Sequence, residues 1–96
     1  MIEITSFKPY VKNTLQGFAT IRLTNIGLEI RDCALHEKNG SRWFQLPSKQ
    51  IVKPDKSQWV YILDFYDKPR GEQFQKAALA ALDDLLAKGQ GGGNGF

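Results

Sequence analysis

Hydrophobic and polar residues alternate along the first half of the chain, as they do in strands that have one buried face. In the clearest example, Ala19, Ile21 and Leu23 point to one side and the residues between them to the other. Ile2 and Ile4 mark the inner face of the first segment in the same way. Four strands are predicted on this basis, at residues 2–11, 18–24, 28–37 and 41–46.

Short turn-forming sequences separate these predicted strands. The pair Asn39-Gly40 lies between two β-like segments, which is a strong indication of a hairpin. Residues 25–27 are few enough for another hairpin connection. Residues 13–17 supply the first turn, in which we expect Gly17 to adopt a positive φ. Consecutive strands joined so tightly are predicted to form an antiparallel meander.

The pattern becomes irregular after Pro47, which cannot donate a hydrogen bond within a sheet and should end the fourth strand. Residues 47–57 are polar and contain two prolines, so we interpret them as a mobile loop with a short edge segment at residues 51–52. Residues 58–66 are predicted to form a fifth strand. Because this segment is apolar on both faces, we expect it to be covered on both sides.

The spacing of apolar residues then changes to that of a helix with one buried stripe. The stripe consists of Phe74, Ala78, Ala81, Leu82 and Leu85. The helix should begin between residues 67 and 71, with Asp67 as its cap and Pro69 in its first turn, and end before Gly89. The predicted fold class is therefore α+β, an antiparallel β-meander of four to five strands followed by one C-terminal α-helix.

Composition adds a domain boundary and a charge asymmetry to this picture. Residues 1–88 are expected to be one nucleic-acid-binding domain, and the Gly-rich residues 89–96 a flexible tail. The net charge is +3, and residues 1–71 contain 11 Lys or Arg against 7 Asp or Glu. A basic, strand-rich part suits a polyanionic partner, although solubility alone also accounts for an excess of this size.

The sequence contains no recognisable catalytic constellation. The lone Cys33 excludes an internal disulfide and is interpreted as a small core residue. With one cysteine and only His36 as a histidine, a zinc site within the chain is not expected. We therefore expect no enzymatic activity, no catalytic residues, no metal and no cofactor. Nothing resembles a signal peptide or a membrane span, so the expected location is the cytoplasm, without a membrane partner.

Basic residues interleaved with aromatic ones are what binding of single-stranded nucleic acid requires, because cations follow the phosphates and aromatic faces stack on bases. The lysines of the predicted loop are favoured as ligands, since long loops are often functional. The aromatic residues of the strands are interpreted as core, with base stacking as the alternative; they are Trp43, Phe44, Trp59 and Phe65. The candidate nucleic-acid ligands are Arg22, Arg42, Lys49, Lys53, Lys56, Lys68 and Arg70.

Several short sequences combine into a family resemblance. Asp32 ends an alternating segment, the Asn39-Gly40 turn follows, and Trp-Phe-Gln-Leu-Pro-Ser-Lys occupies residues 43–49. Arg70-Gly71 then precedes the helix. Over residues 2–86 the chain resembles the bacterial SpoVG family, whose members share these features.

The resemblance to SpoVG proteins implies a small dimeric regulator that binds DNA or RNA, linked historically to sporulation and septation. Lys49 and Arg70 are the basic positions that match the family, whereas Gln50 stands where a second basic residue is usual. The transferable expectation is nucleic-acid binding by a homodimer, formed through sheet edges or helices.

A second resemblance rests on architecture alone. Curved antiparallel strands followed by one helix are similar to single-strand-DNA-binding transcriptional coactivators related to the plant Whirly proteins, of which phage versions would suit a chain of this size. These resemblances leave DNA and RNA, and single and double strands, as alternatives, with single strands favoured. A third alternative is a protein–protein interaction module whose positive charge is incidental.

Overall fold

The structure is a computed structural model that describes residues 1–88. The tail predicted at residues 89–96 lies outside this range. The described part is an α+β fold, which confirms the predicted class. Its elements, in chain order, are β1 (Ile2–Lys12), β2 (Leu15–Leu23), β3 (Leu28–Lys38), β4 (Ser41–Gln45), β5 (Ser48–Val52), β6 (Ser57–Tyr61) and α1 (Lys68–Ala87).

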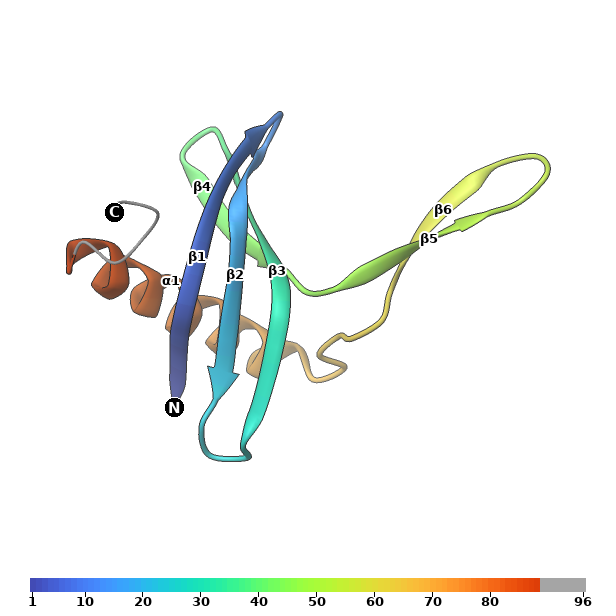
Figure 1. Ribbon diagram of the computed structural model, residues 1–96. Helices are drawn as coiled ribbons and strands as arrows, with labels where there is room; N and C mark the ends of the chain where they lie inside the picture. Colours follow the sequence, from blue (N-terminus) through green and yellow to red (C-terminus); the bar gives the residue numbers. More distant parts are fainter. Residues whose placement is uncertain (89–96) are drawn as a thin grey trace.

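The first four strands form the predicted antiparallel meander, in the spatial order β1-β2-β3-β4 (Figure 1). The connection between β3 and β4 is the two-residue turn Asn39-Gly40. Both residues have positive φ, 54° and 83°, which is the backbone that a two-residue hairpin with a primed turn requires. The Asn-Gly prediction is therefore confirmed by the backbone as well as by the position of the turn.

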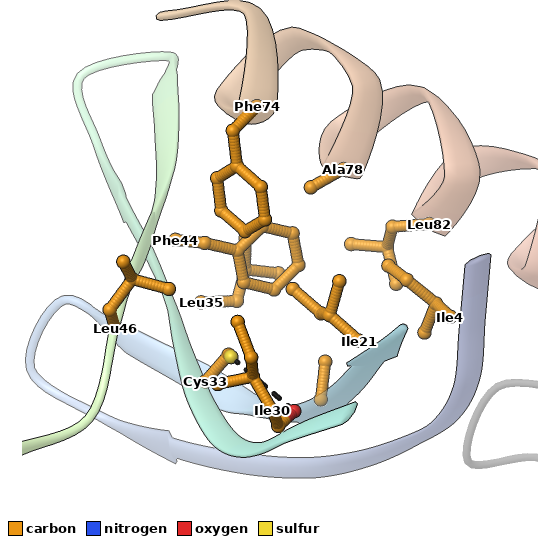
Figure 2. Packing of buried hydrophobic residues seen from close by; sticks show 11 residues of the cluster. Ile4, Ile21, Ile30, Cys33, Leu35, Phe44, Leu46, Phe74, Ala78 and Leu82 are labelled. Carbon is orange, nitrogen blue, oxygen red and sulfur yellow. Dashed lines mark hydrogen bonds between the residues drawn. The ribbon is translucent and has the colours of Figure 1, made fainter. Parts of the chain in front are cut away.

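Helix α1 packs across one face of this sheet and buries the predicted stripe (Figure 2). Phe74, Ala78 and Leu82 are its buried residues. The cap is also as predicted, because Asp67 Oδ1 accepts a hydrogen bond from the backbone N–H of Arg70 over 3.3 Å. The sheet contributes the other buried side chains of the core, Ile4, Ala19, Ile21, Ile30, Cys33, Leu35, Phe44 and Leu46.

The expectation that Gly17 would supply a positive φ at the first turn is wrong. Asn13 adopts that conformation, with a φ of 56°, and Gly17 lies inside β2. A Cβ on Gly17 would lie 2.6 Å from the Phe7 ring and 2.6 Å from the Lys8 carbonyl oxygen. The glycine is therefore required by close packing between β1 and β2, and not by turn geometry.

The mobile loop predicted at residues 47–57 is also wrong. Residues 48–52 of this segment are strand β5, which pairs with β6 in a separate two-stranded antiparallel sheet. We call this hairpin, residues 48–61, the arm. It extends away from both the four-stranded sheet and α1 (Figure 1). Pro47 does end β4, but the chain resumes strand pairing immediately after it.

The fifth strand is shorter and far more exposed than predicted. It ends at Tyr61, and residues 62–67 form an irregular connection to α1. Trp59 and Ile62 are each 65% exposed, so the expectation of cover on both sides is wrong for this chain taken alone. An apolar sequence indicates that a strand favours burial. It does not show which surface, in the same chain or in another molecule, packs against the strand.

Candidate nucleic-acid interface

Side chains alternate between the two faces of the arm, so its basic and aromatic residues lie on opposite faces. Trp59 is paired with Gln50, whereas Lys49 is paired with Val60. Neighbouring pairs face opposite sides of a two-stranded sheet, so the aromatic and the lysine positions lie on different faces. At the tip, the backbones of Lys53 and Lys56 exchange two hydrogen bonds, of 2.7 and 3.3 Å.

The three arm lysines are available to a ligand and lie together on one projecting hairpin. Lys49, Lys53 and Lys56 are all exposed. Within residues 1–88, none of them forms an ion pair. Their ammonium groups are therefore free to approach phosphates without first leaving a carboxylate.

Arg22, by contrast, is engaged by acidic residues on neighbouring strands. Its Nε lies 2.9 Å from Glu29 Oε1, and its guanidinium reaches Glu3 at 4.0 Å. The hydrogen bond from Arg22 lowers the pKa of the Glu29 carboxyl, and the same bond raises the pKa of Arg22. The positive charge of Arg22 is thus compensated on the sheet surface.

Arg42 is compensated in a similar way, but across the fold. Its guanidinium makes two hydrogen bonds to the carboxylate of Asp83, of 2.9 and 3.0 Å, and so joins β4 to α1. The bond lowers the pKa of Asp83 and raises that of Arg42. A bidentate pair of this kind fixes geometry, so we assign Arg42 a structural role.

The start of α1 lies beside the base of the arm. Tyr61 from the arm and Lys68 from the helix line one hollow of about 310 Å³. Arg70 lies 3.4 Å from Asp67, the cap residue, with its side chain 78% exposed. Tyr66 is completely exposed in the same connection. The structure therefore brings Lys68 together with Tyr61 and Tyr66, and it places Arg70 beside Tyr66.

The sheet face opposite α1, here called the outer face, is rich in aromatic residues. Tyr10 and Phe18 lie with ring centroids 6.2 Å apart, and His36 stacks on Trp43 at 5.4 Å. His36 is held by hydrogen bonds with Thr14 and Gln45, of 2.9 and 3.0 Å.

The core interpretation of the four strand aromatics is right only in part. It is confirmed for Phe44, which is buried, and Phe65 packs against the core. It is wrong for Trp59, and Trp43 is 38% exposed on the outer face. Sequence reasoning missed Tyr10 as an exposed aromatic residue. The alternation of β2 places the half-buried Phe18 on the face opposite Ala19, as the sequence predicts.

A groove runs between the outer face and the arm, with a volume of about 770 Å³. Phe18, Ala34 and His36 line its sheet side, and Trp59 and Ile62 line its arm side. The walls meet where β4 passes into β5. The fold therefore forms a V-shaped apolar cleft that is open at the outside.

The remaining polar chemistry is sparse. Cys33 is fully buried, and burial, assisted by the nearby Asp32 charge, raises the pKa of its thiol to about 12. The expected core role of Cys33 is therefore confirmed.

Among the described residues, no group of His, Cys, Asp and Glu side chains is placed to hold a metal ion. Over the same part of the chain, no helix has the length and apolar character needed to cross a bilayer.

Comparisons with known proteins gave no match to a family, to a curated protein or to a solved structure.

Proposed function

We propose that the protein is a non-enzymatic nucleic-acid-binding regulator that acts as a homodimer of the SpoVG type, with the arm lysines as the phosphate contacts. The observation that carries this proposal is the contrast between Lys49, Lys53 and Lys56, which are exposed and form no ion pair with described residues, and the compensated Arg22 and Arg42. Free cations on a projecting hairpin are accessible to a polyanion from several directions.

A single strand is the favoured ligand. Tyr61 and Tyr66 are exposed near Lys68, where they combine a cation with aromatic faces. Stacking of a base on an aromatic side chain contributes about 1–3 kcal/mol and tolerates any base sequence. The bases of a duplex are already stacked on one another and would leave these tyrosines unused.

The test is a salt series of binding to single-stranded DNA, duplex DNA and RNA, followed by fluorescence anisotropy. The variant K49A/K53A/K56A should bind single strands more weakly. Its log–log salt slope should be shallower by about 0.7 per lysine that contacts a phosphate. The matched control K12A/K38A/K76A removes the same charge from exposed lysines outside the arm, and its slope should remain that of the parent. Equal losses in both variants would show that only net charge matters.

A second candidate function is a protein–protein interaction module, as in the third alternative from the sequence. The exposed apolar residues of the arm favour it, since Val52 is 76% and Trp59 65% exposed. This candidate would replace the first if the parent protein bound none of the three nucleic acids at low salt.

A further inference from the structure

We propose that the arm of one protomer docks in the groove of a second copy, and that the second arm docks reciprocally in the first groove. We call this arrangement the clasp. The clasp names the contact surfaces of the homodimer in the proposed function, and it rests on that proposal. Its starting point is the arm, whose strands pair with each other but pack extensively neither on α1 nor on the four-stranded sheet.

An isolated two-stranded hairpin is at best marginally stable in water and needs a further apolar surface to pack against. The arm presents Trp59, Val52 and Ile62 for such packing, all mostly exposed. Within residues 1–88 no second layer packs closely on the arm, which extends away from α1 and meets the outer face only across the open groove (Figure 1). A second copy of the chain would supply the missing cover.

The outer face is the complementary surface on the same chain. Phe18, Ala34 and the ring of His36 form the floor, and Trp43 and Tyr10 extend it along the sheet. Because each copy carries both an arm and a groove, a two-fold axis lets both contacts form at once and leaves no unmatched surface. The outward-facing lysine face of each arm would remain free for phosphates.

The exposed area is large enough for a stable dimer. Aromatic side chains bury about 150–250 Å² each when fully covered. Trp59, Trp43 and Tyr10 are 38–65% exposed, so they would bury on the order of 300 Å² per protomer. Val52, Ile62 and the groove floor raise this towards the roughly 800 Å² per partner of a standard interface.

The surface of α1 is a poorer alternative. The side of the helix that faces away from the sheet carries exposed charged residues, including Glu72, Lys76 and Asp84. The β4 edge is covered in part as well, since Gln75 from α1 hydrogen-bonds to the backbone of Phe44. The clasp therefore replaces the sheet-edge or helix contact expected from the sequence.

The clasp is tested by sedimentation equilibrium at high salt and without nucleic acid, so that nucleic acid cannot bridge protomers. The parent should be a dimer at tens of micromolar. Trp59→Ala on the arm and Ala34→Glu on the groove floor should each raise the dimer dissociation constant by at least about tenfold. Ile26→Ser removes an equally exposed apolar residue from the β2–β3 turn and should leave it unchanged. Circular dichroism checks that each variant retains the fold.

Three results would overturn the clasp. They are a monomeric parent, a dimer that survives both Trp59→Ala and Ala34→Glu, and a dimer weakened by only one of them. A monomeric parent that still bound single-stranded DNA through its arm lysines would remove the clasp and keep nucleic-acid binding. A Trp59→Ala dimer with weakened DNA binding would assign Trp59 to base stacking instead.

Discussion

The side-chain amide of Gln75 forms two hydrogen bonds with the backbone of Phe44. The Phe44 N–H donates to Gln75 Oε1 over 2.8 Å, and Gln75 Nε2 donates to the Phe44 carbonyl oxygen over 2.7 Å. The helix side chain thus supplies the partner that a fifth strand would have supplied at this position of the β4 edge. Unpaired edge groups are a site of unwanted strand pairing, and here one pair of them is occupied from within the fold.

Gln75→Ala should therefore destabilise the protein more than an ordinary surface substitution. It leaves a backbone donor and acceptor of the buried Phe44 without their partner, which costs about 1–3 kcal/mol. Urea unfolding followed by circular dichroism measures the loss. Gln73→Ala, on the exposed side of the same helix, is the matched control and should stay within about 0.5 kcal/mol of the parent. Similar free energies of unfolding for the two variants would show that the hydrogen bonds of Gln75 to Phe44 do not stabilise the fold.

Gly17→Ala should lower the melting temperature. The added methyl group would lie 2.6 Å from both the Phe7 ring and a backbone oxygen, and overpacking of this kind costs about 1–3 kcal/mol. The comparison is Gly27→Asn, at a turn position with a φ of 68° and open space around it, where asparagine is tolerated. Thermal unfolding should separate the two variants by several degrees. A Gly17→Ala protein as stable as the parent would mean that β1 and β2 adjust without cost.

The Arg42–Asp83 pair should contribute to stability at neutral pH and not in strong acid. Its hydrogen bonds hold the pKa of Asp83 below the ordinary value of 3.8, so the folded state favours the ionised carboxylate. The contribution is therefore present above that value and is lost as the pH falls through the lower pKa of the folded state. For an exposed pair it amounts to about 0.2–1 kcal/mol.

Thermal unfolding of Asp83→Asn and the parent at pH 7 and pH 2 measures this dependence. The parent should be the more stable protein at pH 7, and the difference should shrink in acid. Asp84→Asn, which removes a neighbouring exposed carboxylate that forms no ion pair within residues 1–88, provides the control. A difference between Asp83→Asn and the parent that stays constant with pH would contradict the assignment.

The sequence predicted those parts of the fold that local patterns determine. The Asn39-Gly40 hairpin, the Asp67 cap and the stripe of Phe74, Ala78 and Leu82 are all present, because each depends on residues close together in the chain. Gly17 was misinterpreted for the opposite reason. Its constraint comes from Phe7 on another strand, and turn statistics contain no information about that contact.

The candidate site was less predictable than the fold. From the sequence, Arg42 and Lys49 are equally good candidates for a phosphate contact. In the structure, Arg42 is paired with Asp83, which lies 41 residues away along the chain. The pairing of β5 with β6 was hidden because Pro47 and Pro54 made the segment resemble a loop. The exposure of Trp59 could not be predicted either. The apolar residues around Trp59 match the pattern of a buried strand, and this pattern does not show whether the same chain or another molecule buries the strand.

The separation of the arm from the core has a consequence for how such a protein changes over evolutionary time. No arm residue belongs to the buried cluster that joins the sheet to α1, so substitutions on the arm do not disturb the packing on which folding depends. Under the proposed function, the phosphate contacts and the core packing of the protomer lie in different stretches of the same gene. Selection can alter the arm lysines without a compensating change in the core, whereas the clasp constrains the apolar residues of the arm to match the groove.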